Sequence, residues 1–382
     1  MLAPRWLTHQ AELDKHKRKP PAVPASGQFD STPARASFGL RRWLRGSLIL
    51  CAWSYPAILL ALWLGFYWVG EAWWVTAAGL YVPRLPFLVP VPFVALALYA
   101  WGLRRLLWTQ VLAAFIVTVP LMGFILPWPM RAQRAAPTLR VLSFNVNSAI
   151  GGAQALIDKI VAASADIVLL QEAPGGTQLV DALRVHYPYV QSSTQFIIAS
   201  RFPITAATDP DRLFYCGRTR PPRFMRYELK TPIGPLALYN IHPISPRGVL
   251  HIRQLRAALH QLRTGELFAG DPEADVESNV GLRALQVEAV TNDAARESLP
   301  VLIAGDTNLP GLSALLRKRL SGYTDAFRAA SWGFGYTFPE QHPFLRLDRI
   351  LASDKLRFSS FRTDCHGVSD HLCVVADLQA RQ

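Results

Sequence analysis

Cysteine is scarce in this sequence, and its cysteines lack the spacing of a metal site. The 382 residues include only Cys51, Cys216, Cys365 and Cys373. None belongs to a CxxC pair or a mixed Cys/His cluster, which excludes the common zinc-binding patterns. Cys365 and Cys373 are expected to be partly buried thiols. A Cys216–Cys365 disulfide is the alternative in an oxidising compartment.

Charged residues are also few, at 18%, whereas hydrophobic residues make up 51% and the mean hydropathy is +0.16. This composition indicates membrane segments. The net charge of +13 is concentrated in residues 1–135, which hold 14 Lys and Arg against 4 Asp and Glu. The remainder holds 26 against 23, so the basic excess does not indicate nucleic-acid binding by the C-terminal part.

Three long runs contain no charged residue: Ser47–Gly70, Leu85–Leu103 and Leu106–Met130. About 20 residues span a bilayer, so each run is long enough. Tryptophans lie at the ends of the runs, as in an aromatic belt; they are Trp68, Trp101, Trp108 and Trp128. The sequence therefore predicts a membrane anchor with three transmembrane helices over residues 41–135. The second helix has the weakest signal because it contains three prolines.

The first 40 residues are polar, basic and rich in proline, and are predicted to form a disordered tail. A nucleic-acid-binding arm is the alternative interpretation of this charge. The tail is too long and too polar for a standard cleaved signal peptide.

The placement of arginine predicts the orientation of the anchor. Arg41, Arg42 and Arg45 precede the first run, and Arg104 and Arg105 separate the second from the third. The positive-inside rule puts both groups in the cytoplasm. Three crossings then place the C-terminal domain on the outer, periplasmic side of a bacterial inner membrane. If one helix does not span, this orientation reverses.

From Leu139 onward, short apolar strands alternate with amphipathic stretches, which predicts one α/β domain over residues 136–382 with mixed sheets. The expected strands are Leu139–Val146, Ile167–Leu170, Phe196–Ala199, Leu236–Ile241, Val301–Ala304, Leu347–Leu351 and Cys373–Leu378. The expected helices are Ala153–Ala163, Leu250–Arg263 and Leu282–Arg296. Leu267–Val280 is acidic and rich in turn formers, and is expected to be a solvated insertion.

Polar side chains follow several of these strands. The strand Val301–Ala304 runs directly into Gly305-Asp306-Thr307-Asn308, where alternation puts Asp306 and Asn308 on one side. A turn or cap is the structural explanation of any single case. Six such groups in one domain favour a site instead. They are Ser143-Phe144-Asn145, Gln171-Glu172, Asn240-Ile241-His242, Gly305–Asn308, Leu347–Ile350 and Ser369-Asp370-His371.

These residue types suit metal-assisted hydrolysis of a phosphoester. Glu172 offers carboxylate oxygen to a hard cation such as Mg²⁺. His371 is the candidate base, and Asp348 would fix its tautomer. His242 and Asn308 would donate to the phosphate oxygens. Asp306 would orient the attacking water or approach the metal.

In this order, the six motifs resemble those of the endonuclease/exonuclease/phosphatase superfamily, over about Leu139 to Leu378. The resemblance implies a four-layer α/β/β/α sandwich of two packed mixed β-sheets flanked by helices, here after three N-terminal transmembrane helices. It also implies Mg²⁺ or Mn²⁺, with Asn145, Glu172 and Asp370 near the metal. The Asp348–His371 pair and the phosphate contacts from His242 and Asn308 are implied as well. The function expected is therefore a membrane-anchored phosphodiesterase or phosphatase; a nuclease and a non-catalytic membrane scaffold are the alternatives.

A second polar cluster is a candidate substrate-binding surface, because arginines and aromatics alternate along it. Its arginines are Arg218, Arg220, Arg223 and Arg226. An ordinary basic loop is the structural alternative. The expected partners are the lipid bilayer and a phosphate ester, which could be a lipid headgroup, an inositol phosphate or a nucleic acid. No obligate protein partner is evident from the sequence.

Overall fold

The computed structural model describes residues 32–126, 137–173, 177–246 and 271–381. It divides into two compact units, Met1–Ser47 and Leu48–Gln382. The boundary falls inside helix α1 (Thr32–Leu64). The second unit therefore contains both the apolar segments that follow Ser47 and all of the sheets.

Two helices of the described residues are long and apolar enough to cross a membrane, Gly39–Ala72 and Arg104–Leu121. The shorter apolar segment Leu85–Ala100 includes α3 (Pro90–Ala100). Prolines limit its helix at the N-terminal end, so the prediction of three spans is not confirmed. The other helices here are α2 (Trp74–Gly79) and α4 (Leu107–Ile116).

The predicted tail needs one correction, because α1 begins at Thr32 and residues 32–40 are helical. Ala34, Arg35 and Leu40 are good helix formers, which favours extension of the apolar helix into this stretch. Residues 1–31 lie outside the described part of the chain.

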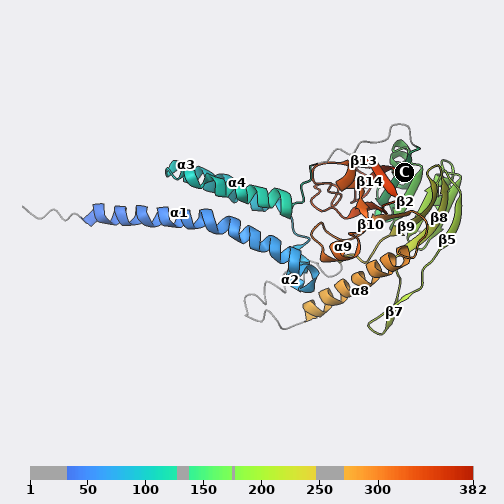
Figure 1. Cartoon of the computed structure of the whole chain (residues 1–382), viewed down its shortest axis with the longest axis horizontal. Coiled ribbons are helices and arrows are strands. Elements are labelled where there is room, and N and C mark those ends of the chain that lie inside the picture. The colour runs from blue at the N-terminus through green and yellow to red at the C-terminus, as the bar shows by residue number, and fades with distance from the viewer. Residues whose placement is uncertain (1–31, 127–136, 174–176, 247–270, 382) are drawn as a thin grey trace, which may run out of the picture. The chain divides into compact units, whose positions relative to one another are not determined.

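The C-terminal region contains two six-stranded mixed sheets and a small hairpin (Figure 1). The first sheet has the order β13-β14-β1-β2-β4-β3, with β13 (Leu356–Asp364), β14 (Cys373–Ala380), β1 (Leu139–Asn145), β2 (Ile167–Gln171), β4 (Phe196–Ser200) and β3 (Tyr189–Ser193). The second has the order β11-β12-β10-β9-β8-β5, with β11 (Thr324–Asp325), β12 (Asp348–Ala352), β10 (Val301–Asp306), β9 (Gly234–Ile241), β8 (Phe224–Thr231) and β5 (Ile204–Thr208). The hairpin pairs β6 (Leu213–Tyr215) with β7 (Arg218–Arg220).

Alternation along the strands builds three apolar layers. Val141 and Ile167 of the first sheet meet Leu238 and Leu302 of the second in a core between the sheets. The opposite face of the first sheet packs on α5 (Ala153–Ala162) and α6 (Thr177–Arg184). The opposite face of the second packs on α8 (Asp271–Ala294). The predicted four-layer sandwich is confirmed. Two short helices complete it, α9 (Ala314–Arg319) and α10 (Ala326–Ala330).

Two local predictions were wrong. The acidic segment Leu267–Val280 is not a loop where it is described, because α8 begins at Asp271. Its acidic residues stand near the helix N-terminus, where the helix dipole favours them. Cys365 and Cys373, which were expected to be thiols, form a disulfide with each other, and Cys216, the alternative partner of Cys365, is free. The expected helix Leu250–Arg263 lies outside the described residues.

Candidate active site

Both sheets present their functional side chains on the face between them. In β1, Leu139 and Val141 lie in the inter-sheet core, so alternation puts Asn145 on the same face. In β10, Leu302 and Ala304 also lie in the inter-sheet core, so Asp306 faces the space between the sheets as well. Since β1 is parallel to β2, and β10 to β9, the carboxyl ends of the strands in each pair share one edge of their sheet.

Gly305 is required where β10 ends. Its φ is +151°, and a Cβ at this position would lie 1.9 Å from the carbonyl oxygen of Ile241. Only glycine allows β9 and β10 to approach this closely, which brings His242 and Asp306 to the same place.

The carboxylate of Asp306 is the point on which the other groups converge. Its Oδ2 accepts a hydrogen bond from Asn145 Nδ2 at 3.1 Å. The same oxygen lies 3.6 Å from Nε2 of His242 and 3.8 Å from Nε2 of His371. Its Oδ1 accepts from the backbone N–H of Asn308 at 2.9 Å. Residues from three other motifs therefore meet at this buried side chain.

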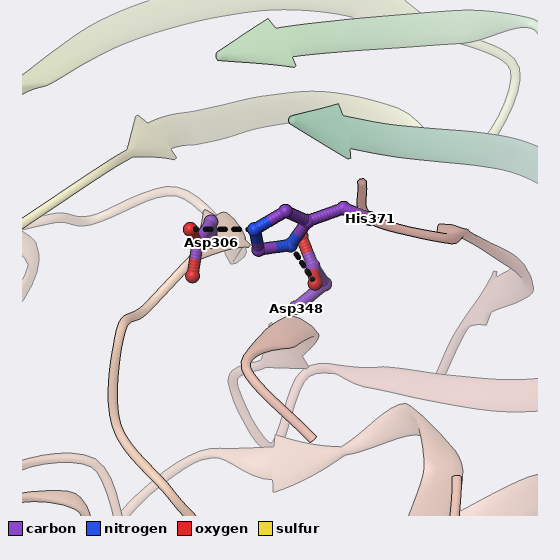
Figure 2. Close-up of side chains that lie close together, drawn as sticks. All are labelled: Asp306, Asp348 and His371. Carbon is purple, nitrogen blue, oxygen red and sulfur yellow. Dashed lines mark hydrogen bonds and ion pairs between the residues drawn. The ribbon is translucent and has the colours of Figure 1, made fainter. Parts of the chain in front are cut away.

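His371 lies between two aspartates, as Figure 2 shows. Its Nδ1 is 2.8 Å from Oδ2 of Asp348, and its Nε2 faces Asp306. Burial would lower the pKa of His371, but attraction by Asp348 and Asp306 outweighs it and raises the pKa to about 9. The ring also packs against Phe338, with ring centroids 4.8 Å apart.

His242 is oriented by a residue that the sequence did not single out. Its Nδ1 lies 2.8 Å from Oε1 of Gln195, which stands in the turn between β3 and β4. Its Nε2 is 3.3 Å from Oε1 of Glu172. Because Gln195 occupies Nδ1, Nε2 is the atom available to a ligand. A polar residue in a turn gives no sequence signal for this role.

Glu172 and Asp370 lie at the more open side of the site. The side chain of Glu172 is 28% exposed, and its Oε1 accepts from Asn145 Nδ2 at 3.1 Å. Asp370 precedes His371 and adds to the attraction that raises the pKa of that histidine. The hydroxyl of Ser369 ties this loop to the carbonyl oxygen of Asn145 at 2.8 Å.

The predicted arginine surface is divided by the structure. Arg226 is engaged by Glu228 and Glu297, so it serves an ion-pair network. Arg218 and Arg220 lie on the hairpin strand β7. Only Arg223 is tied to the site among these four: its carbonyl accepts from the N–H of His242 at 2.9 Å. Burial lowers the pKa of its guanidinium, and attraction to Glu172 opposes the shift.

The oxygen donors fit a divalent cation. The carboxylates of Glu172 and Asp306 both approach the same amide nitrogen of Asn145 and the same nitrogen of His242. Two carboxylates this close repel each other unless a positive charge lies between them. Asp306, Asp348 and His371 also offer ligand atoms within 4.8 Å of one another. However, Asp348 and His371 already bond to each other through Nδ1 of His371, so this pair is less available to a cation. Glu172 and Asp306 are therefore favoured as the ligands.

Fold and site together define a metal-dependent hydrolase of phosphate esters: two packed mixed sheets carry carboxylates, amides and a His–Asp pair at one edge. Comparison with protein families agrees. The Endonuclease/Exonuclease/phosphatase family matches residues 142–371, and the chain belongs to this family. Comparison with curated proteins finds no match. Members of the family are divalent-metal-dependent phosphodiesterases, nucleases and phosphatases.

Solved structures with a similar fold share little sequence identity with this chain. An endonuclease/exonuclease/phosphatase from Beutenbergia cavernae is 16% identical, with a TM-score of 0.44, over 64% of this chain and 72% of its own. Truncated TDP2 from Caenorhabditis elegans is 19% identical, with a TM-score of 0.43, over 64% and 98%. Beta toxin from Staphylococcus aureus is 16% identical, with a TM-score of 0.45, over 62% and 99%.

Proposed function

We propose that the protein is a membrane-anchored phosphoesterase that uses Mg²⁺ or Mn²⁺ and hydrolyses its substrate by in-line attack of water. The observation that carries the proposal is the convergence on Asp306. Asn145, His242 and His371 all lie within 3.8 Å of its carboxylate, although they come from separate strands and loops. Packing alone does not explain why three ionisable side chains, Asp306, His242 and His371, lie together in a buried position, whereas a catalytic site does.

His371 takes the proton from the attacking water in this proposal, and Asp348 stabilises the resulting imidazolium. His242 Nε2 and the Asn308 amide donate to the phosphate oxygens as negative charge develops. Glu172 and Asp306, with Asn145 and Asp370 beside them, would hold the cation. When bound, the cation would neutralise these carboxylates, polarise the phosphoryl group and favour the neutral form of His371.

The charges near the site and over the C-terminal domain indicate which class of phosphate ester is the substrate. The guanidinium of Arg223 interacts electrostatically with Glu172, which supports binding of a phosphate group beside that carboxylate. Arg226 is unavailable because two glutamates engage it. The near-neutral charge of the C-terminal domain does not favour long duplexes, which need many phosphate contacts. A phospholipid headgroup or another small phosphate ester is therefore favoured over nucleic acid.

A hydrolysis screen of the purified, detergent-solubilised protein tests the proposal. The panel contains nucleic acids, phospholipids and inositol phosphates, each with Mg²⁺. His371→Ala and Asp306→Ala are the inactive controls. We expect metal-dependent release of product from one class, lost in both variants. Equal, metal-insensitive rates in the wild type and both variants would exclude the catalytic proposal.

We also propose that the catalytic domain lies on the periplasmic side of a bacterial inner membrane, which requires the short apolar segment Leu85–Ala100 to cross the membrane as well. The Cys365–Cys373 disulfide supports this side, since disulfides persist in oxidising compartments. A reporter fused after Gln382 that works only outside the cytoplasm tests the orientation. Activity of a cytoplasm-specific reporter at the same position would reverse it.

A further inference from the structure

The segment between the first two apolar runs forms hydrogen bonds with residues beside the candidate active site. This segment comprises residues 71–84, and two of its side chains bond to the catalytic domain. Glu71 accepts from the backbone N–H of Ala314 at 2.8 Å and is 92% buried. The hydroxyl of Tyr81 donates to the backbone carbonyl of Asn308 at 2.8 Å.

Tyr81 also connects Asn308 to the loop that follows β9. Its hydroxyl accepts from Nη1 of Arg283 at 2.8 Å, and Nε of Arg283 donates to the carbonyl of Ile244 at 2.9 Å. The side-chain amide of Asn308 donates to the carbonyl of Pro243 at 3.0 Å. These bonds close a ring around the two loops that carry His242 and Asn308. Arg283 is almost fully buried, so the ring is shielded from water.

The backbone of Asn308 needs this support. Its φ is +50°, in the left-handed region that non-glycine residues rarely adopt without constraint. Asp306 holds the N–H of Asn308, and Tyr81 holds its carbonyl. Without the Tyr81 hydroxyl, the carbonyl side of this strained residue is released. Relaxation there would move the side chain that is proposed to contact the phosphate.

We propose that Tyr81 is a positioning residue that holds Asn308 in its phosphate-binding conformation, so that the anchor region completes the active site. This inference rests on the proposed function of Asn308. The segment between the apolar runs would then have a role beyond membrane attachment, because its Tyr81 holds Asn308, which lies 227 positions away in the chain.

The test compares Tyr81→Phe with Tyr55→Phe in the full-length protein. Tyr55 is a matched control because its hydroxyl donates to the carbonyl of Phe87, within the N-terminal apolar segments. We expect Tyr81→Phe to lower kcat about 10-fold, with a smaller change in KM, because misplacement of a group that stabilises the transition state acts mainly on kcat. Tyr55→Phe should stay within about twofold of the wild type.

A double-mutant cycle separates positioning from general destabilisation. If Tyr81 acts through Asn308, Tyr81→Phe should cost less than about twofold in an Asn308→Ala background. An undiminished 10-fold loss in that background would overturn the inference. So would a wild-type rate for Tyr81→Phe in a protein that hydrolyses its substrate.

Amide hydrogen exchange tests the same inference without relying on activity. Peptides covering residues 305–312 should exchange faster in Tyr81→Phe than in the wild type or Tyr55→Phe, while peptides from β1 and β14 remain unchanged. Unchanged exchange at residues 305–312 would overturn the positioning role even if no substrate were found. Faster exchange without any hydrolysis would count against the proposed function alone.

Discussion

Nδ1 of His371 and Oδ2 of Asp348 form a buried pair 2.8 Å apart, and both side chains are no more than 1% exposed. Asp348 is the first residue of β12 and lies opposite Asp306 in the sheet. Its backbone N–H is held by the hydroxyl of Thr337 at 3.3 Å. The pair is thus fixed by strand register and by a loop contact, and Nε2 of His371 faces Asp306 in consequence.

Asp348→Asn should reduce kcat by about 100-fold, because it preserves shape but removes the charge that stabilises the imidazolium. Asp377→Asn is the matched control, since Asp377 pairs with Arg140 at the far end of the sheet from the site. Steady-state rates of the two variants on the substrate identified by the screen provide the comparison. Similar rates for both variants would mean that the pair has no catalytic part.

The raised pKa of His371 predicts how stability depends on pH in metal-free protein. Its folded pKa of about 9 exceeds the ordinary value of 6.5, so the charged ring stabilises the fold fully below about pH 6.5. This stabilisation is lost as the pH rises through 9. Melting temperatures measured with a chelator from pH 6 to 10 should therefore fall more steeply for the wild type than for His371→Gln.

His366→Gln is the control for that experiment, because His366 also contacts a glutamate but is exposed. Its melting curve should parallel that of the wild type. Parallel curves for all three proteins would contradict the assigned role of the Asp348 and Asp306 charges.

The sequence predicted that polar side chains gather at strand ends, and the structure places several of them together. Asn145 and His242 contact Asp306, and Asp348 lies opposite Asp306 in the sheet. By contrast, β13 was missed. A bulge between Phe358 and Ser360 breaks its period of two, so its apolar residues do not alternate regularly.

Long-range partners could not be predicted from local patterns. Gln195 reaches His242 from a turn, and Tyr81 reaches Asn308 from the anchor region. The cysteine pairing was also hidden, since it depends on Cys373 lying opposite Asp364 in the register of β13 and β14. These contacts depend on how the elements pack, which residue spacing does not encode.

The Cys365–Cys373 disulfide predicts a defined thiol count. Of the four cysteines, only Cys51 and Cys216 are free. Mass spectrometry of denatured, alkylated protein should therefore find two modified cysteines without reductant and four with it. Cys373→Ala should lower the free energy of unfolding by about 2–3 kcal/mol, because the closed loop is short. Cys216→Ala is the control and should change stability by less than about 0.5 kcal/mol. Four alkylated cysteines without reductant would exclude the disulfide.

Glu172 should control both activity and metal-dependent stability. Mg²⁺ binds the folded protein and not the unfolded chain, so at 100 times its Kd it should stabilise the wild type by about 3 kcal/mol. Glu172→Gln keeps the side-chain volume but removes a charged ligand, and should abolish most of this gain together with the Mg²⁺-dependent rate. Glu228→Gln, at a carboxylate that pairs with Arg226 away from the site, should retain both. Thermal unfolding with and without Mg²⁺ measures the gain independently of any substrate. An equal Mg²⁺ response in wild type and Glu172→Gln would show that the cation binds elsewhere.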